Sequence, residues 1–153
     1  MRIISLSEDK KFEKRIAVTP DIAKKYINLG FELSLPENYG VHLGINDNLF
    51  KDIGVIILKD EKELINNSDL IIQLGLLADE KLSLIREGQS IVGAFNPYNN
   101  KKKIESLVKK KVNLFSLELL PRITRAQSMD ILSSQANLAG YKAVIESFAN
   151  FEK

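Results

Sequence analysis

The stretch TPDIAKKYINLGFELSL, residues 19 to 35, decides the fold that we expect for this chain. Thr19 is a typical N-cap, Pro20 suits the first position of a helix, and Gly30 is the residue most often found just beyond a helix C-terminus. The apolar run after Gly30 predicts a strand, and a similar run at residues 2–6 precedes the helix. The amino-terminal segment therefore predicts two parallel strands joined by a helical crossover.

Further short runs of Ile, Val and Leu continue this alternation of strands and helices to the end of the chain. The runs are continuous rather than alternating with polar residues, which is typical of parallel strands covered on both faces. We expect strands at residues 2–6, 32–35, 55–58, 70–74, 90–94 and 112–116, and further helices at 47–53, 61–65, 79–85, 101–109 and about 129–151. The predicted fold class is α/β, a doubly wound, mainly parallel sheet of about six strands with flanking helices, flavodoxin-like or Rossmann-like, with a long C-terminal helix.

The last helix is unusually rich in small residues near its start, so that another backbone or a ligand can approach it closely; they are Ser133, Ser134, Ala136, Asn137, Ala139 and Gly140. Further along it, four apolar residues recur at helical spacing and are expected to lie in the core: Tyr141, Val144, Ile145 and Phe148.

Length and composition exclude several classes of function. At 153 residues the chain is expected to form a single domain, residues 1–153, and the formal charge of +2 gives no field that favours nucleic acid. Without Cys and with His42 as its single His, the chain is not expected to hold a metal. No stretch approaches the roughly 18 apolar residues of a membrane helix, and the N-terminus does not resemble a signal peptide, so we expect a soluble chain.

A polar segment, PRITRAQSMD at residues 121–130, lies between the last predicted strand and the last helix. In open α/β sheets, ligands bind beyond the carboxyl ends of the strands. Arg122 can donate a pair of hydrogen bonds to phosphate or carboxamide oxygens, while Gln127 and Asp130 can bracket an amide or a ribose hydroxyl. The segment therefore suits a nucleotide, and the alternative is a surface loop in which Asp130 only caps the helix.

The run from residue 121 to residue 143 resembles the signature of the N-terminal lobe of the NAD(H)-binding component, the alpha subunit, of proton-translocating nicotinamide nucleotide transhydrogenase, a lobe whose fold alanine dehydrogenase shares. The resemblance implies that Arg122, Gln127, Asp130 and Ser133 contact the nicotinamide, ribose and phosphate region of NAD(H). It also implies that the four residues help to hold NAD(H) against NADP(H) bound on another component, with Gln127 and Asp130 as the catalytic positions.

The pyrophosphate cradle of a dinucleotide-binding domain is missing, because none of the eight glycines forms a G-x-G-x-x-G turn. The resemblance therefore covers the first lobe of the family's component and implies a second, Rossmann lobe in the same or another chain. It further implies partners that bind NADP(H) and cross the membrane, a homodimer when complete, and a place at the inner face of the cytoplasmic membrane, or the matrix side in mitochondria. We expect the isolated 153 residues to fold without catalysis.

Alanine dehydrogenase places different chemical demands on this lobe. It needs a cation for the substrate carboxylate and an acid–base group, whereas transfer of hydride between two nicotinamides needs only positioned rings. Arg15 matches an Arg of both relatives and is expected in the substrate cleft, but Gln73 and Asn96 stand where alanine dehydrogenases have a substrate-binding Lys and a catalytic His. The transhydrogenase is favoured. The alternatives are an alanine dehydrogenase-like oxidoreductase lobe and a non-catalytic binding or assembly module.

Overall fold

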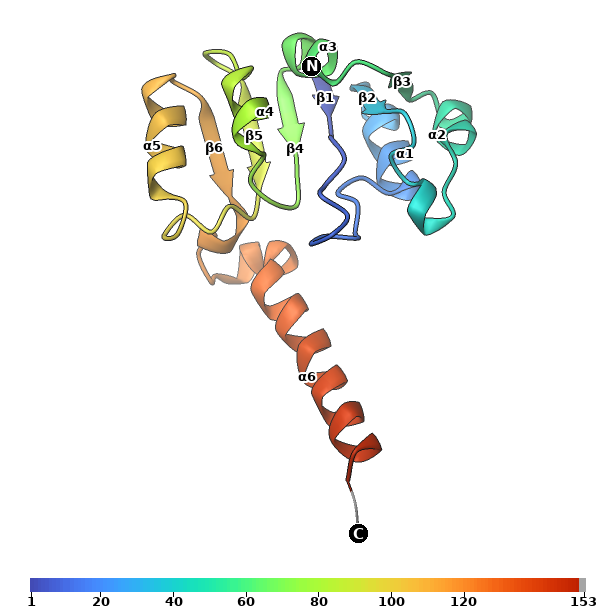
Figure 1. Cartoon of the computed structure of the whole chain (residues 1–153), viewed down its shortest axis with the longest axis vertical. Helices are drawn as coiled ribbons and strands as arrows, with labels where there is room; N and C mark the ends of the chain where they lie inside the picture. Colours follow the sequence, from blue (N-terminus) through green and yellow to red (C-terminus); the bar gives the residue numbers. More distant parts are fainter. Residues whose placement is uncertain (152–153) are drawn as a thin grey trace. The chain divides into compact units, whose positions relative to one another are not determined.

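The computed structural model describes residues 1–151 and divides the chain into two compact units. The first unit is Met1–Ser116, and the second begins at Leu117 (Figure 1). The expectation that residues 1–153 act as one lobe of a larger protein stays a prediction.

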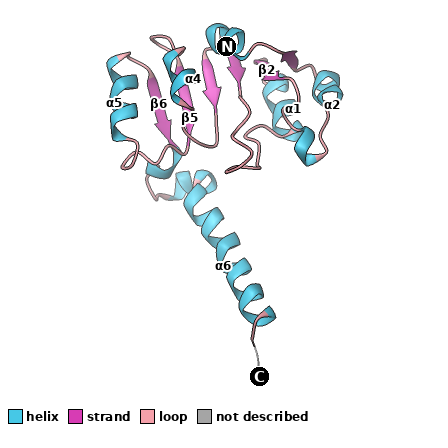
Figure 2. Ribbon diagram, viewed as in Figure 1, coloured by secondary structure: helices cyan, strands magenta, loops and turns pink. Residues whose placement is uncertain are grey.

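The first unit is built on a six-stranded sheet in which every pairing is parallel, with the order β3-β2-β1-β4-β5-β6. Figure 2 shows the strands in magenta with helices beside them. This arrangement confirms the expected fold class, and the order is that of a doubly wound sheet with its switch point between β1 and β4. The strands are β1 Arg2–Ile4, β2 Glu32–Pro36, β3 Ile56–Leu58, β4 Leu70–Ile72, β5 Ser90–Gly93 and β6 Asn113–Ser116.

Helices follow the strands as the local sequence signals predict. Thr19 caps the first helix, since its hydroxyl accepts a hydrogen bond from the Ile22 N–H at 3.4 Å. Gly30 follows its end with φ of +81°, a conformation that costs glycine little. The helices of this unit are α1 Pro20–Asn28, the 3₁₀ helix η1 Val41–Leu43, α2 Asp47–Ile53, α3 Glu61–Asn67, α4 Asp79–Ser83 and α5 Lys101–Lys109.

Each face of the sheet has its own apolar core. Ile3 of β1 packs in a cluster with Leu33 and Phe50, which also contains residues of α1 and α2. The next residue, Ile4, belongs to a second cluster with Ile71 and Leu107, to which α3, α4 and α5 contribute. Full burial of one such side chain stabilises the fold by roughly 1.5–3 kcal/mol, so the two clusters hold the helices on both faces.

Two strands end two residues earlier than their apolar runs predict. β1 stops at Ile4 rather than at residue 6, and β4 stops at Ile72 rather than at residue 74. Beyond these points the Leu6 N–H and C=O pair with the side-chain amide of Gln73 instead of with a neighbouring backbone. The main-chain ladder between β1 and β4 is thus replaced by side-chain hydrogen bonds at the carboxyl edge of the sheet.

The second unit consists, through Phe151, of the long helix α6 Ile131–Ala149 and two short 3₁₀ helices, η2 Leu117–Leu119 and η3 Thr124–Met129. The long C-terminal helix is therefore confirmed, but the core expected on it is wrong. Tyr141, Val144, Ile145 and Phe148 are between 45% and 79% exposed. The physical reason is that residues 117–151 form no second layer of secondary structure against which a face of α6 could be buried.

We predict that Gly93→Ala destabilises the chain. A Cβ at residue 93 would lie 2.5 Å from the Gln73 carbonyl oxygen and 2.7 Å from Phe95 Cε1, so β5 would have to shift. The expected loss is about 1–3 kcal/mol in the free energy of unfolding, measured by urea titration with circular dichroism.

Gly140→Ala is the matched control, since an added Cβ there meets nothing within 4 Å and Ala favours the helix. An equal loss of stability in both variants would show that the crowding at residue 93 is not the cause.

Candidate functional site

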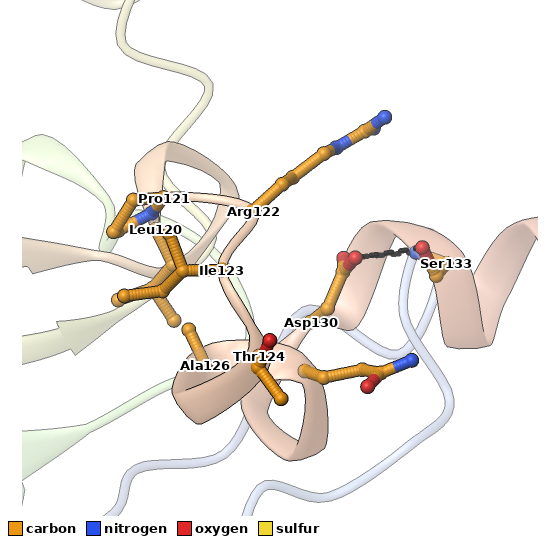
Figure 3. Close-up of a pocket in the computed structure, with 9 residues that line it drawn as sticks. Leu120, Pro121, Arg122, Ile123, Thr124, Ala126, Asp130 and Ser133 are labelled. Carbon is orange, nitrogen blue, oxygen red and sulfur yellow. Dashed lines mark hydrogen bonds between the residues drawn. The ribbon is translucent and has the colours of Figure 1, made fainter.

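A cavity of about 330 Å³ lies in the second unit, around the start of α6. All four residues that the resemblance assigns to the nucleotide line it, namely Arg122, Gln127, Asp130 and Ser133, and Figure 3 labels Arg122, Asp130 and Ser133 among its lining. The rest of its lining is Leu120, Pro121, Ile123, Thr124 and Ala126. The structure thus brings together residues that are spread over twelve positions of the chain.

The backbone explains why these residues meet. Ile123 is extended, and the chain then turns into η3 at Thr124. The Asp130 N–H donates to the Gln127 carbonyl at 3.3 Å, so η3 ends where α6 begins. The segment expected as a loop is therefore a 3₁₀ turn that folds back on the first turn of α6, and Gln127 and Ser133 come to line the same cavity.

Asp130 and Ser133 are bonded to each other. One carboxylate oxygen of Asp130 accepts from the Ser133 N–H at 3.0 Å, and the other accepts from the Ser133 hydroxyl at 2.6 Å. The Ser133 hydroxyl, followed by its N–H, holds the pKa of Asp130 below its ordinary value, so the group is a carboxylate at neutral pH. Asp130 is therefore the N-cap of α6, as the capping alternative predicts, whether or not it also binds a ligand.

Arg122 and Gln127 are exposed, and within residues 1–151 neither side chain makes a hydrogen bond or ion pair. Figure 3 shows the Arg122 side chain extending away from the ribbon, while the Asp130 carboxylate turns toward Ser133. The guanidinium can donate a pair of hydrogen bonds to one planar acceptor group, and the Gln127 amide can both donate and accept. The cavity thus offers several polar groups with spare capacity beside an apolar wall.

Arg15 belongs to the first unit and does not line this cavity. Its guanidinium forms a bidentate pair with Glu13, with N···O distances of 2.9 and 2.6 Å. This hydrogen bonding lowers the pKa of Glu13. The expected role of Arg15 in a substrate cleft stays a prediction.

Gln73 is the position where alanine dehydrogenases have a Lys, and its side chain is committed to the protein. It is 3% exposed, and its amide hydrogen-bonds the Leu6 N–H, the Leu6 C=O, the Ser5 hydroxyl and a Glu8 oxygen. Asn96 lies on the loop after β5 with φ of +46°, and its carbonyl accepts from the N–H groups of Asn99 and Asn100. Neither residue supplies the cation or the acid–base group that an amino-acid substrate needs.

Glu8 is a polar residue that the sequence reasoning missed. It is half-buried and accepts hydrogen bonds from Gln73, Leu74 and Gly75. Its signal in the sequence is an acidic residue just beyond a strand, which is too common to be singled out. His42 has an exposed ring, whose Nε2 donates a hydrogen bond to the Lys14 carbonyl oxygen at 2.7 Å.

Residues 1–151 contain neither a metal cluster nor a membrane-spanning helix. No three His, Asp or Glu side chains in this part of the chain lie close enough together to hold a metal ion. None of the helices described is both long enough and apolar enough to cross a bilayer.

Comparison with known proteins places this chain in a family. Residues 5–139 match the family model of the alanine dehydrogenase/PNT N-terminal domain. The match covers most of the chain, so the chain belongs to the alanine dehydrogenase/PNT N-terminal domain family.

The similar proteins with the higher identities are transhydrogenases. The chain is 36% identical to the first part of the NAD(P) transhydrogenase alpha subunit of Rhodospirillum rubrum, over 100% of this chain and 41% of the relative. The crystal structure of transhydrogenase from Sinorhizobium meliloti superimposes with a TM-score of 0.85 at 32% identity, over 98% of this chain and 45% of that one. The chain thus spans less than half the length of these relatives.

Alanine dehydrogenases are more distant. Alanine dehydrogenase 1 of Staphylococcus aureus is 22% identical over 95% of this chain and 38% of its own length. The transhydrogenase side of the family is therefore better supported, in agreement with the side chains at positions 73 and 96.

We predict that Asp130→Ala loosens the start of α6. Without the carboxylate, the Ser133 N–H loses its acceptor, and its amide hydrogen should exchange with solvent several-fold faster in NMR exchange measurements. Because the pKa of Asp130 lies below the ordinary 3.8, the cap is complete above that pH and is lost only as the pH falls through the folded-state pKa.

Asp130→Asn is the control, since an Asn side chain caps a helix about as well as Asp. If exchange at residue 133 is the same in the wild-type chain and in Asp130→Ala, the cap does not hold this turn.

Proposed function

We propose that this chain is the N-terminal lobe of the NAD(H)-binding component of a proton-translocating NAD(P) transhydrogenase, an oxidoreductase that transfers hydride between NAD(H) and NADP(H). The observation that carries the proposal is the cavity at the start of α6. It is lined by the four polar residues that the family resemblance assigns to the nucleotide, and two of them have unused hydrogen-bonding capacity.

The chemistry required of such a lobe is positioning. The bound nucleotide supplies the hydride, and the protein has to fix the orientation of the nicotinamide relative to a second nicotinamide. Gln127 is suited to hold the carboxamide group, because an amide pairs with an amide through one donor and one acceptor. Arg122 is suited to the phosphate or carboxamide oxygens, to which its fork can donate two hydrogen bonds.

Asp130 and Ser133 act as a pair in this proposal. The hydrogen bond between them fixes the carboxylate at the N-terminus of a helix of 19 residues. An acceptor fixed in this way can receive a ribose hydroxyl without first losing side-chain freedom. The pair therefore orients the ribose rather than taking up or releasing a proton.

The pyrophosphate must be held elsewhere. This chain has no G-x-G-x-x-G turn, and its relatives are more than twice as long as the part that it matches. We propose that a Rossmann lobe, in the same or another chain, closes the nucleotide site. We also propose that partner components bind NADP(H) and cross the membrane. The complete protein is then a homodimer that lies at the inner face of the membrane.

We predict that Gln127→Ala in the complete enzyme slows hydride transfer much more than it weakens NADH binding. Loss of one orienting amide should reduce the single-turnover rate by about 10- to 100-fold, with a change in the Kd for NADH of no more than about threefold. The rate is measured by stopped-flow absorbance, and the Kd by fluorescence titration.

Arg125→Ala is the matched control, because Arg125 lies in the same 3₁₀ helix but does not line the cavity. An unchanged single-turnover rate in Gln127→Ala, or an equal fall in both variants, would refute the proposed role.

We also predict that the 153-residue chain alone binds NADH only weakly. Without the second lobe, the pyrophosphate has no cradle, so saturation should require millimolar NADH in a fluorescence or calorimetric titration. Saturation at micromolar NADH would show that the cavity of the second unit suffices and that the inferred lobe is unnecessary for binding.

A further inference from the structure

The first unit has a cavity of its own, of about 570 Å³. It is lined by residues that follow β1, such as Glu8, and by residues that follow β4, such as Gln73 and Gly75. β1 and β4 are neighbours from which the chain leaves in opposite directions along the sheet. The cavity therefore lies at the switch point, which is the usual ligand position in an open α/β sheet.

Two successive backbone donors face this place. The N–H groups of Leu74 and Gly75 follow the end of β4 and point to the same acceptor, as in the backbone nests that bind anions. Here the acceptor is part of the protein. Oε1 of Glu8 lies 2.7 Å from the Leu74 nitrogen and 3.3 Å from the Gly75 nitrogen.

Gln73 fixes Glu8 in this position. Its Nε2 donates to the same Glu8 oxygen at 3.0 Å, and to the Leu6 carbonyl at 3.0 Å. Its Oε1 accepts from the Leu6 N–H at 2.8 Å. The carboxylate of Glu8, which follows β1, thus bonds the backbone that follows β4. In return, the amide of Gln73, which follows β4, bonds the backbone of Leu6, which follows β1. The amide has no donor left for a ligand.

The charges around the cavity do not favour an anion either. Each cation that lines it is already paired, Lys81 with Glu61 at 2.8 Å and Lys103 with Asp79 at 2.8 Å. Arg15, whose charge acts on Glu8, is paired with Glu13. The charged groups that line the cavity with Glu8 are Asp9 and Glu13 from its own loop, Lys81 from α4 and Lys103 from α5, and Arg15 also acts on Glu8 electrostatically.

We propose that Glu8 is an internal anion that occupies the backbone donors of Leu74 and Gly75 and so closes the switch-point cavity to small carboxylates. This cavity is not the one proposed for the nucleotide, and Glu8 gives it a selectivity of its own. Removal of Glu8 leaves the same two N–H groups in place, where a small carboxylate can accept both hydrogen bonds.

The test is the variant Glu8→Ala in the full chain, with sodium formate as the probe and sodium chloride keeping the ionic strength constant. Binding is followed through the backbone amide resonances of Leu74 and Gly75 in ¹H–¹⁵N spectra. We expect Glu8→Ala to bind formate at these two amides about tenfold more tightly than the wild-type chain does. The reason is that formate can then accept charge-assisted hydrogen bonds from both N–H groups. No gain at these amides would overturn the proposal.

Two control variants distinguish occupancy of the Leu74 and Gly75 N–H groups by Glu8 from simple repulsion of anions by its negative charge. Glu8→Gln removes the charge but keeps an oxygen that can accept from both N–H groups, so we expect little gain. Asp9→Ala removes a neighbouring carboxylate that accepts a hydrogen bond from the Lys11 N–H in its own loop, and we again expect no gain at residues 74 and 75. A gain in either control equal to that in Glu8→Ala would mean that general repulsion, not occupancy, keeps anions out.

The wild-type chain gives an independent check if Glu8→Ala does not fold. Burial raises the pKa of Glu8 above the ordinary 4.5, even though backbone N–H groups oppose the shift. The amide protons of Leu74 and Gly75 should therefore both titrate with a midpoint above 4.5, together with the Glu8 carboxyl carbon. If these amides do not follow Glu8, the carboxylate does not occupy them and the proposal fails.

Discussion

Successive side chains of a strand point to opposite faces, and the architecture of the first unit depends on how β1 uses this rule. Ile3 and Ile4 are 1% and 2% exposed, and each lies in a different core cluster. Since β1 pairs with β2 on one side and β4 on the other, it connects the two halves of the sheet as well as the two cores. The same central position creates the switch point, where the backbone ladder ends and polar side chains take its place.

The two cavities differ in whether their polar groups are already hydrogen-bonded within the protein. At the switch point the amide of Gln73 and an oxygen of Glu8 are satisfied within the protein, so the donors there are not offered to a ligand. At the start of α6, Asp130 and Ser133 are paired, but Arg122 and Gln127 extend from the same short segment without hydrogen-bond partners among residues 1–151. The difference in spare hydrogen-bonding capacity is the reason for assigning the nucleotide to the second cavity.

Local signals allowed much of this to be predicted. The bounds of α1 follow from Thr19, Pro20 and Gly30, because caps and backbone conformation are decided within a few residues. The ends of β1 and β4 could not be predicted, since the partner of Leu6 is a side chain 67 positions away. The exposure of Tyr141 and Phe148 could not be predicted either. Helical spacing shows that one face of a helix is apolar, but not that another surface packs against that face.

The sequence by itself determined the alternation of strands and helices, the cap at Asp130 and the family to which the chain belongs, all of which depend on residues close together in the chain. Only the tertiary structure decided the strand order and which polar groups meet across it. The pairing of Glu8 with the N–H groups of Leu74 and Gly75 is such a contact. Its energy depends on distances between atoms that the chain brings together only when both cores have formed.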